Sequence, residues 1–439
     1  MAGVLALIML DETIIGVALP TIRRDLSLSQ TGSHWVVNAY LLVFASLSAL
    51  GGKLYDLFSI KRTFFAGVVL FALASLACGF ARDGAWLVGF RVVQGIGAAV
   101  IFPGCVAIIT RVFPEHQRGM AFGVQTAVGG VSMALGPLVG GVLTQSVSWR
   151  WIFWVNPPLA LLVAAAMLLV WQSPSSPSQG RQFDAPGLMS FVVGITSIVL
   201  ATMQGAVWGW SSAPTVSLFV LGVLALCAFV RIELRAPQPL IHLELFRREA
   251  FAVGNLVIFV AEASKITFII FGALYAQDVL HLSPLSAGLA ITISIALSPI
   301  SSILAGRLAD RHGARRPTLF GLALQGSAFC GLALAVVGRK LGFLAPPAVL
   351  WGASLPFVYV PPRRAVMSAA PIDKGGQAGG VSMTAQLLGG TVGMSVSGAL
   401  YVATHDFSVL FWVCGGCELA VLLVAWLALG KHSTGRVGS

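Results

Sequence analysis

Charged side chains inside long apolar stretches are the residues of this sequence most able to do chemistry. Asp11, Glu12, Arg91, Glu262 and Lys265 all lie in such stretches. A charge in an apolar helix costs several kcal/mol unless it is paired or hydrated, so each is a candidate functional residue. Asp11 lies about halfway along the first stretch, where it could bind and release a proton, as an ion-coupled carrier requires; a structural pairing with a neighbouring helix is the alternative.

The spacing of these charges suggests how they are arranged. Successive residues of a helix point about 100° apart, so Asp11 and Glu12 cannot share a face. One of them is expected to face a cavity. Glu262 and Lys265 are three residues apart and can pair on one helix face. Their role is either functional or that of a self-neutralising structural pair.

The sequence offers no support for an enzyme. The seven histidines show no Ser-His-Asp order and no metal spacing, and there is no phosphate-binding GxxxxGK[ST] loop. The six cysteines lie inside apolar runs, so neither a disulfide framework nor a zinc site is expected. Without a site for ATP or another cofactor, the energy source is expected to be an ion gradient.

The elements that must position these residues are membrane-spanning helices. The chain has 439 residues, of which 57% are hydrophobic and only 10% charged, and its mean hydropathy is +0.89. A bilayer core requires about 20 apolar residues per helix, and only helices satisfy their own backbone there. We predict an all-α polytopic protein with spans at 1–22, 34–52, 62–80, 86–108, 119–143, 150–171, 186–206, 213–231, 251–272, 285–305, 317–337, 343–361, 377–402 and 407–429. Ten residues before Asp11 are few for a complete first span, so a misassigned start codon is one alternative.

The placement of the basic residues predicts the orientation. With fourteen spans, 19 of the 27 Lys and Arg residues fall on the side of the two termini and six on the opposite side. Basic segments stay in the cytoplasm during insertion, so both termini are expected to be cytoplasmic in a multi-pass protein of the inner membrane. The same asymmetry accounts for the net charge of +11 without a nucleic-acid partner.

Two weak copies of one unit divide the chain. Gly52-Lys53-Leu54-Tyr55-Asp56, followed by Lys61-Arg62, aligns with Gly306-Arg307-Leu308-Ala309-Asp310, followed by Arg315-Arg316. Transporters are often built from repeated halves with the substrate site between them. We therefore predict a six-helix half over 1–172, a linker with two inserted helices over 173–240, and a second six-helix half over 241–439.

These motifs resemble the major facilitator superfamily. The Gly-x-Leu-x-Asp loop is similar to its signature loop, for which Asp310-Arg311-His312-Gly313 is the fuller match. The segment that begins Arg91-Val92-Val93-Gln94-Gly95 is similar to its second motif, and Gly136-Pro137-Leu138-Val139-Gly140-Gly141 to its antiporter motif. The segment from Leu10 to Pro20 resembles the first helix of the fourteen-helix drug/proton antiporters, in which Asp11 is the expected acid, so Asp11 rather than Glu12 is expected to face the cavity.

The resemblance implies roles for the matching residues. Arg91 would assist proton transfer through a nearby carboxylate; a structural ion pair or a backbone anchor is the alternative. Gly136, Pro137, Gly140 and Gly141 would form a close helix interface that seals the cavity, or simply pack tightly. Asp56 and Asp310 could cap a helix N-terminus or pair with the nearby Lys61, Arg62, Arg315 or Arg316. The charges around Gly52 and Gly306 would gate the two access states by breaking and remaking such contacts, unless they are plain loop charges. The gating set is Gly52, Asp56, Lys61, Arg62, Gly306, Asp310, Arg311, Gly313, Arg315 and Arg316.

The leading hypothesis is a proton-coupled antiporter that exports amphipathic or cationic drugs. A carrier of one endogenous metabolite is the alternative, and a membrane enzyme or sensor is a third class. The expected partners are a small-molecule substrate, protons and the lipid bilayer, with a periplasmic adaptor and an outer-membrane channel as further candidates.

Overall fold

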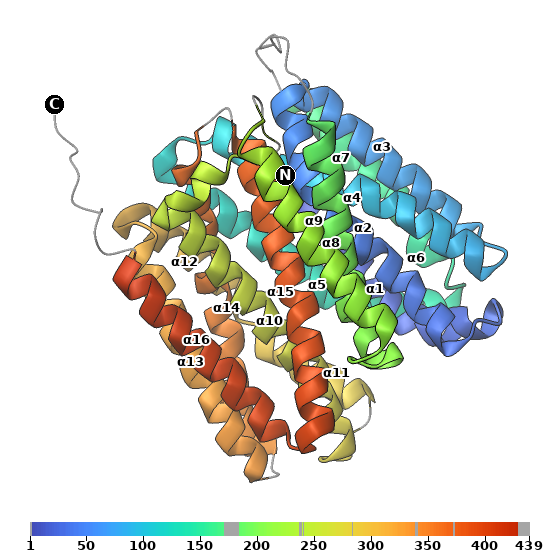
Figure 1. Cartoon of the computed structure of the whole chain (residues 1–439). Coiled ribbons are helices and arrows are strands. Elements are labelled where there is room, and N and C mark those ends of the chain that lie inside the picture. Colours follow the sequence, from blue (N-terminus) through green and yellow to red (C-terminus); the bar gives the residue numbers. More distant parts are fainter. Residues whose placement is uncertain are drawn as a thin grey trace.

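The computed structural model describes residues 2–170, 184–236, 239, 241–282, 284–338, 341–371 and 374–428. Every regular element in these ranges is helical (Figure 1). The first group of helices is α1 (Ala2–Asp25), α2 (Gln30–Leu57), α3 (Ile60–Gly79), α4 (Gly84–Val112), α5 (Glu115–Ser146), α6 (Trp151–Trp154) and α7 (Asn156–Val170). The middle of the chain forms α8 (Ala185–Trp208), α9 (Ala213–Glu233) and the short η1 (Leu243–Arg247). The last group is α10 (Glu249–Asp278), α11 (Pro284–Ile295), α12 (Ser298–His312), α13 (Arg315–Val337), α14 (Leu341–Ala369), α15 (Gly375–Thr404) and α16 (Phe407–Ala428).

Thirteen candidate spans in the described part of the chain are long and apolar enough to cross a membrane. The segments α6–α7 and α11–α12 each make one of them. The helix α1, 24 residues long, is not among the thirteen but packs in the same bundle, and with it the helices match the fourteen predicted spans in order.

Several helices run further than their apolar stretches. Arg363 and Arg364, predicted to lie in a loop after residue 361, belong to α14, which continues to Ala369. Lys53, predicted to follow its span, lies within α2 and is 6% exposed. The loop assignments were wrong because a helix end buried against other helices can continue past its apolar part when its polar groups find partners there.

The helices α8 and α9 lie between two groups of helices (Figure 1). One group runs from α1 to α7 and the other from α10 to α16. The helix α8 contacts both, because the Thr196 hydroxyl donates to the Ser46 hydroxyl on α2 at 3.0 Å and the Ser395 hydroxyl on α15 donates to the Thr202 carbonyl at 2.9 Å. The helix α9 packs mainly on α8.

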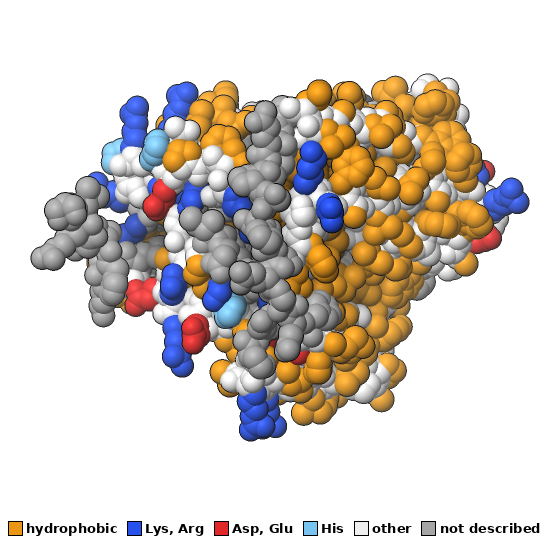
Figure 2. All heavy atoms as spheres, turned by 90° about the horizontal axis from the view of Figure 1, so that it is seen from above, with side chains coloured by type: hydrophobic (Ala, Val, Ile, Leu, Met, Phe, Trp, Pro, Cys, Tyr) orange, Lys and Arg blue, Asp and Glu red, His pale blue; other side chains and the backbone are white. Residues whose placement is uncertain are grey.

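The surface of the bundle has an apolar flank and one basic end. Large apolar side chains are widely exposed on the flank, among them Leu169 at 83% and Val337 at 73%, as expected of a surface that lies against lipid. Figure 2 looks down on the end where α2 meets α3 and α12 meets α13, and shows Lys and Arg side chains gathered there with a few acids and histidines. We call this the basic end.

Candidate functional site

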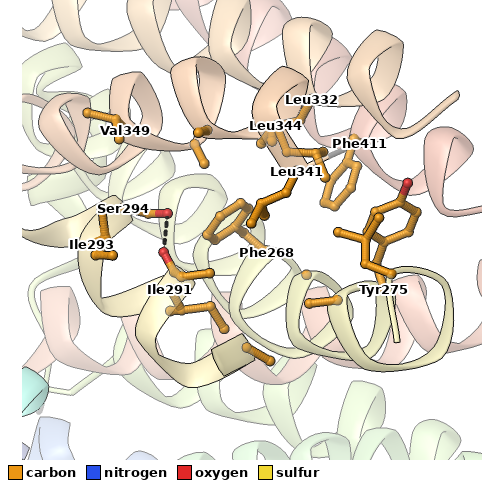
Figure 3. A pocket seen from close by; sticks show the side chains of 17 residues that line it. Phe268, Tyr275, Ile291, Ile293, Ser294, Leu332, Leu341, Leu344, Val349 and Phe411 are labelled. Atoms are coloured by element: carbon orange, nitrogen blue, oxygen red, sulfur yellow. Dashed lines mark hydrogen bonds between the residues drawn. The ribbon is translucent and has the colours of Figure 1, made fainter. Parts of the chain in front are cut away.

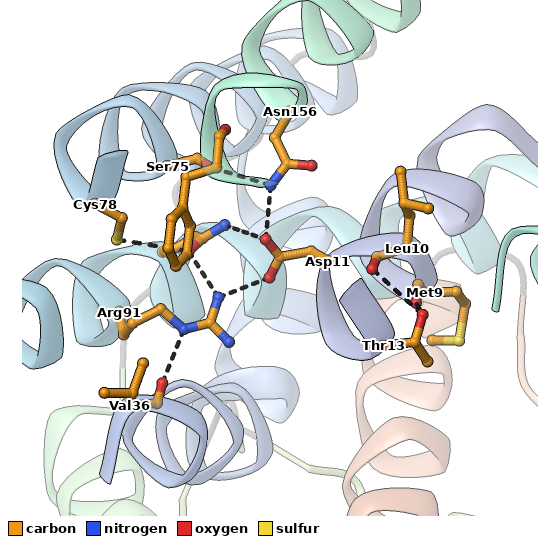
Figure 4. A network of polar contacts seen from close by, with 11 residues as sticks. Met9, Leu10, Asp11, Thr13, Val36, Ser75, Cys78, Arg91 and Asn156 are labelled. Atoms are coloured by element: carbon orange, nitrogen blue, oxygen red, sulfur yellow. Dashed lines mark hydrogen bonds and ion pairs between the residues drawn. The ribbon is translucent and has the colours of Figure 1, made fainter. Parts of the chain in front are cut away.

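Asp11 is the centre of a buried polar network in the first half of the chain (Figure 4). It lies on α1 and is 1% exposed. Its Oδ2 atom accepts a hydrogen bond from Arg91 Nη1 at 2.7 Å, and its Oδ1 atom accepts from Gln94 Nε2 at 2.9 Å and from Asn156 Nδ2 at 2.6 Å. Three donors on α4 and α7 thus surround one carboxylate, which compensates for the water it has lost.

Arg91 joins three helices. Besides its ion pair with Asp11, it donates from Nε to the Val36 carbonyl on α2 at 3.0 Å and from Nη1 to Gln94 Oε1 at 2.8 Å. Its guanidinium carbon lies 4.1 Å from the centre of the Tyr40 ring, a cation–π distance. From the sequence, a nearby carboxylate and a backbone anchor were alternative partners for Arg91. The fully buried Arg91 side chain binds both.

Glu12 points to a different environment. It is partly exposed, and its Oε1 atom is enclosed without a hydrogen-bond partner. The nearby charges that act on it include Lys265 and Glu262 on α10, in the other half of the chain. Asp11 was expected to be the acid that faces a cavity, but in this structure its three donors enclose Asp11 within its own half, and Glu12 lies outside that network.

Glu262 is the centre of the corresponding cluster in the second half. It forms the ion pair with Lys265 that their spacing predicted. Its Oε2 atom accepts from the Tyr359 hydroxyl at 2.7 Å and from Gln386 Nε2 at 2.8 Å. The Gln386 Oε1 atom in turn accepts from Arg363 Nη2 at 2.6 Å. This cluster joins α10, α14 and α15.

Sequence reasoning missed several residues of these two networks. Asn156, Tyr359 and Gln386 are neutral polar residues in apolar helices, and Arg363 was assigned to a loop. Only the cost of burying a polar group without a partner could have marked them, and that cost does not identify the partner.

A different contact closes the basic end. Asp310, on α12, accepts backbone hydrogen bonds from Gly119 at 2.8 Å and Met120 at 2.7 Å, near the N-terminal end of α5. It also pairs with Arg364 Nε at 3.1 Å, and Arg364 Nη2 donates to the Glu115 carbonyl at 3.3 Å. Asp310 was expected to cap a helix N-terminus or to pair with Arg315 or Arg316; here it accepts from the second turn of α5, beyond the position of a cap, and its ion pair goes to Arg364 instead.

Two glycines of the repeated motif make equivalent helix crossings. A Cβ on Gly306 would collide with the Gly119 carbonyl of α5, and a Cβ on Gly52 would collide with the Gly376 carbonyl of α15. Only glycine permits backbones this close. Each crossing joins one half of the chain to the other, so both resist separation of the halves at the basic end.

The other residues of the repeated motif lie around these crossings. Gly313 follows α12 with φ at 74°, a left-handed conformation that favours glycine. Arg315 Nη2 donates to the Trp426 carbonyl at 3.1 Å, while Arg311 is exposed. Further members of the set are exposed or half-buried, namely Lys61, Arg62 and Arg316. The side chain of Asp56 lies outside the described residues.

The glycines of the antiporter motif bring α5 against α1 beside the two acids. A Cβ on Gly136 would collide with the Thr13 side chain, and one on Gly140 would lie 2.6 Å from the Ile14 carbonyl oxygen. Gly141 is half-buried, and the side chain of Pro137 lies outside the described residues. These glycines therefore fix the position of the α1 segment that carries Asp11 and Glu12.

An apolar pocket of about 170 Å³ lies within the second half, away from the basic end (Figure 3). Its walls come from α10, α11, α13, α14 and α16 and include Phe268, Leu344 and Phe411. The hydroxyls of Ser294 and Tyr275 are both used internally, by the Ala290 and Val336 carbonyls at 2.8 Å. The pocket therefore offers a ligand mainly apolar contacts, because both hydroxyl donors are already used.

Comparison with known proteins gives a consistent result. The pattern described as Major Facilitator Superfamily matches residues 1–394 and 254–438. The tetracenomycin C resistance and export protein of Streptomyces glaucescens is 30% identical over 90% of this chain and 73% of its own length. The puromycin resistance protein pur8 of Streptomyces alboniger is 34% identical over 97% and 90%, and the cephamycin export protein CmcT of Amycolatopsis lactamdurans is 35% identical over 89% and 81%. Among solved structures, the human organic anion transporter MFSD10 superimposes with a TM-score of 0.66 at 17% identity, covering 97% of this chain and 98% of that one, which supports the fold.

Proposed function

Because the chain belongs to the major facilitator superfamily, a family of membrane transporters rather than enzymes, we propose that it exports amphipathic or cationic drugs across the inner membrane in exchange for protons. The similarity to resistance and export proteins over about nine-tenths of the chain supports export as the direction. The drive is the proton gradient, and no cofactor takes part.

The observation that carries this proposal is a buried acid inside an apolar helix of each half, namely Asp11 on α1, which is 1% exposed, and Glu262 on α10, which is 7% exposed. Glu12, beside Asp11, is close enough to the second half for the charge of Glu262 to act on it. A proton bound at one of them changes the attraction between the halves. A carrier that alternates between two access states needs such a charge-dependent contact.

The network around Asp11 and Arg91 supports proton coupling in a second way. A conformational change that moves α1 relative to α4 must break or stretch a buried ion pair. Protonation of Asp11 removes the charge that holds Arg91 and lowers the cost of that movement. Arg91 thereby couples the protonation state to the packing of α1, α2 and α4.

We also propose that the basic end is cytoplasmic and that both termini lie on that side. The Asp310 contacts and the two glycine crossings then close the cytoplasmic side in this conformation. Release of Asp310 from Gly119 and Met120 would accompany opening to the cytoplasm, where the substrate enters.

The experiment is proton-driven transport in inverted membrane vesicles. Addition of an accepted drug to energised vesicles should dissipate part of the proton gradient, and Asp11→Asn or Glu12→Gln should abolish this response. Asp25→Asn, at the opposite end of α1, is the matched control and should respond like the wild type. If no drug of a broad panel dissipates the gradient, or if both acid variants still confer resistance in cells, the proposal is wrong.

A carrier of one specific metabolite is the second candidate. The names of three relatives each refer to a single compound, namely tetracenomycin C, puromycin and cephamycin. A deletion strain that accumulates one metabolite, with no change in resistance to unrelated drugs, would favour this candidate. Copurification of the chain with a periplasmic adaptor and an outer-membrane channel would test the further partners.

A further inference from the structure

A carboxylate beside an aromatic face is a suitable site for an organic cation, because both attract positive charge. Two such sites lie in the apolar helices that the structure describes. In the first half, Asp11 and the Tyr40 ring lie together. Arg91 already fills that site, with Nη1 at 2.7 Å from Asp11 Oδ2 and its guanidinium carbon at 4.1 Å from the ring centre.

The second site consists of Glu262 and the Tyr359 ring. Lys265 fills it, because its ammonium pairs with Glu262 Oε1 and lies 5.7 Å from the centre of the Tyr359 ring. The other carboxylate oxygen, Oε2, accepts hydrogen bonds from Tyr359 and from Gln386. Both oxygens of Glu262 are therefore occupied by groups of the chain itself.

Further charges near this second site lie on α14, α16 and α1. Arg363 on α14 and Glu418 on α16 lie near Tyr359, and Glu12 lies across the interface on α1. Arg363 donates to Gln386, and its guanidinium carbon lies 5.7 Å from the centre of the Phe102 ring. The Arg363 guanidinium is therefore also occupied by groups of the chain itself. Among the acids near Tyr359 that the structure describes, Glu262 is the one that forms an ion pair, and its partner is Lys265.

We propose that Lys265 sets the charge of the exported compound: it is a tethered cation that fills the Glu262–Tyr359 site, so the carrier favours amphipathic compounds without a net positive charge. This inference rests on the proposed function and decides between the amphipathic and the cationic compounds named there. A cationic substrate would have to displace the Lys265 ammonium, which its own chain holds permanently at the site. A compound without positive charge meets a cluster whose charges are already paired.

Removal of the Lys265 ammonium should turn the cluster into a cation site. In Lys265→Met the side chain keeps its length and apolar stem, while Glu262 Oε1 and the face of the Tyr359 ring become available. An organic cation then gains a charge-assisted contact and a cation–π contact, for which we expect at least about tenfold tighter binding. Lys265→Arg is the matched control, because it keeps a cation at the site.

The experiment is equilibrium binding of tetraphenylphosphonium to the purified full-length protein in lipid nanodiscs. We expect weak binding to the wild type and to Lys265→Arg, and about tenfold tighter binding to Lys265→Met. The gain should disappear in the double variant Glu262→Gln with Lys265→Met. Equal affinity in wild type and Lys265→Met, or a gain that persists in the double variant, would overturn the proposal.

The wild-type protein provides a second test if Lys265→Met does not fold. Glu262→Gln should leave the weak tetraphenylphosphonium binding of the wild type unchanged, because Lys265 already excludes the cation from Glu262. A loss of affinity of about tenfold in Glu262→Gln would show that the cation binds there despite Lys265 and would refute the inference. Binding at equilibrium requires no proton gradient, so these results are independent of whether the vesicles show proton-driven transport.

Discussion

Replacement of Asp310 by asparagine should open the basic end of the protein. Asp310 accepts hydrogen bonds from Gly119 and Met120 at 2.8 and 2.7 Å and pairs with Arg364 at 3.1 Å. Asparagine keeps the shape but loses the charge, and its amide group cannot accept the second backbone hydrogen bond. One charge-assisted hydrogen bond contributes about 1.5–3 kcal/mol, and the weakened ion pair adds to this, so we expect a loss of about 2–4 kcal/mol.

That loss applies to the closed conformation alone, because the contact joins two helices that must separate. The ratio of closed to open protein should therefore fall by a factor between about 30 and 1,000. A cysteine placed at Ser302, which is buried beside α5, reports on the opening when the six native cysteines have been replaced. In Asp310→Asn, a membrane-impermeant maleimide added from the basic end should label this cysteine at least tenfold faster than in the wild-type background.

The neighbouring Arg311→Gln is the matched control, since Arg311 is exposed and its substitution also removes one charge from the same turn. It should label at the wild-type rate. Arg364→Gln should give a smaller increase than Asp310→Asn, because the two backbone hydrogen bonds remain. If Asp310→Asn labels no faster than Arg311→Gln, the Asp310 contact does not hold this end closed and the reasoning fails.

Three further predictions concern packing, pH and the buried network. Gly306→Val should abolish transport while the protein still reaches the membrane, because its side chain cannot fit at the α5 crossing; Gly288→Ala, where a Cβ meets no neighbour within 4 Å, should transport normally. At the end of α1 outside the apolar part, hydrogen bonds from Trp149 and Arg150 lower the pKa of Asp25 below its ordinary value of 3.8. The stability from this contact is present above pH 3.8 and lost as the pH falls through the lowered pKa, so thermal unfolding should lose part of its acid dependence in Asp25→Asn. Arg91→Gln should destabilise the protein by about 3–5 kcal/mol, since it leaves a buried carboxylate unpaired, and thermal unfolding in detergent should show partial recovery when Asp11→Asn is added.

Much of the fold could be predicted because the bilayer restricts the choice. A run of about 20 apolar residues must be a helix in lipid, so composition alone predicted the order of the spans. The ends of the helices were less predictable. The charges of Arg363 and Arg364 predicted a loop. In the structure, however, Arg363 donates a hydrogen bond to Gln386 and Arg364 to Asp310, and with these partners α14 can continue to Ala369.

The contacts of the repeated motif were harder to predict for a similar reason. The motif named Gly306 and Asp310 together, and both lie at one helix crossing, while their gating role stays a prediction. It suggested the nearby Arg315 and Arg316 as ion-pair partners, since they are close in sequence. The observed partner, Arg364, is 54 positions away and belongs to a helix whose packing no local pattern describes.

The two neighbouring acids show most clearly where sequence reasoning reaches its limit. Helical geometry alone establishes that Asp11 and Glu12 face different ways, but it does not say which way either one faces. The answer depends on Arg91, Gln94 and Asn156, which together enclose Asp11 within its own half. Once they do, the 100° step along α1 turns Glu12 away from these donors, and its Oε1 atom is enclosed without a hydrogen-bond partner. The residue that matches the motif therefore anchors α1 within its own half, while the residue beside it lies outside that network and within reach of the charge of Lys265.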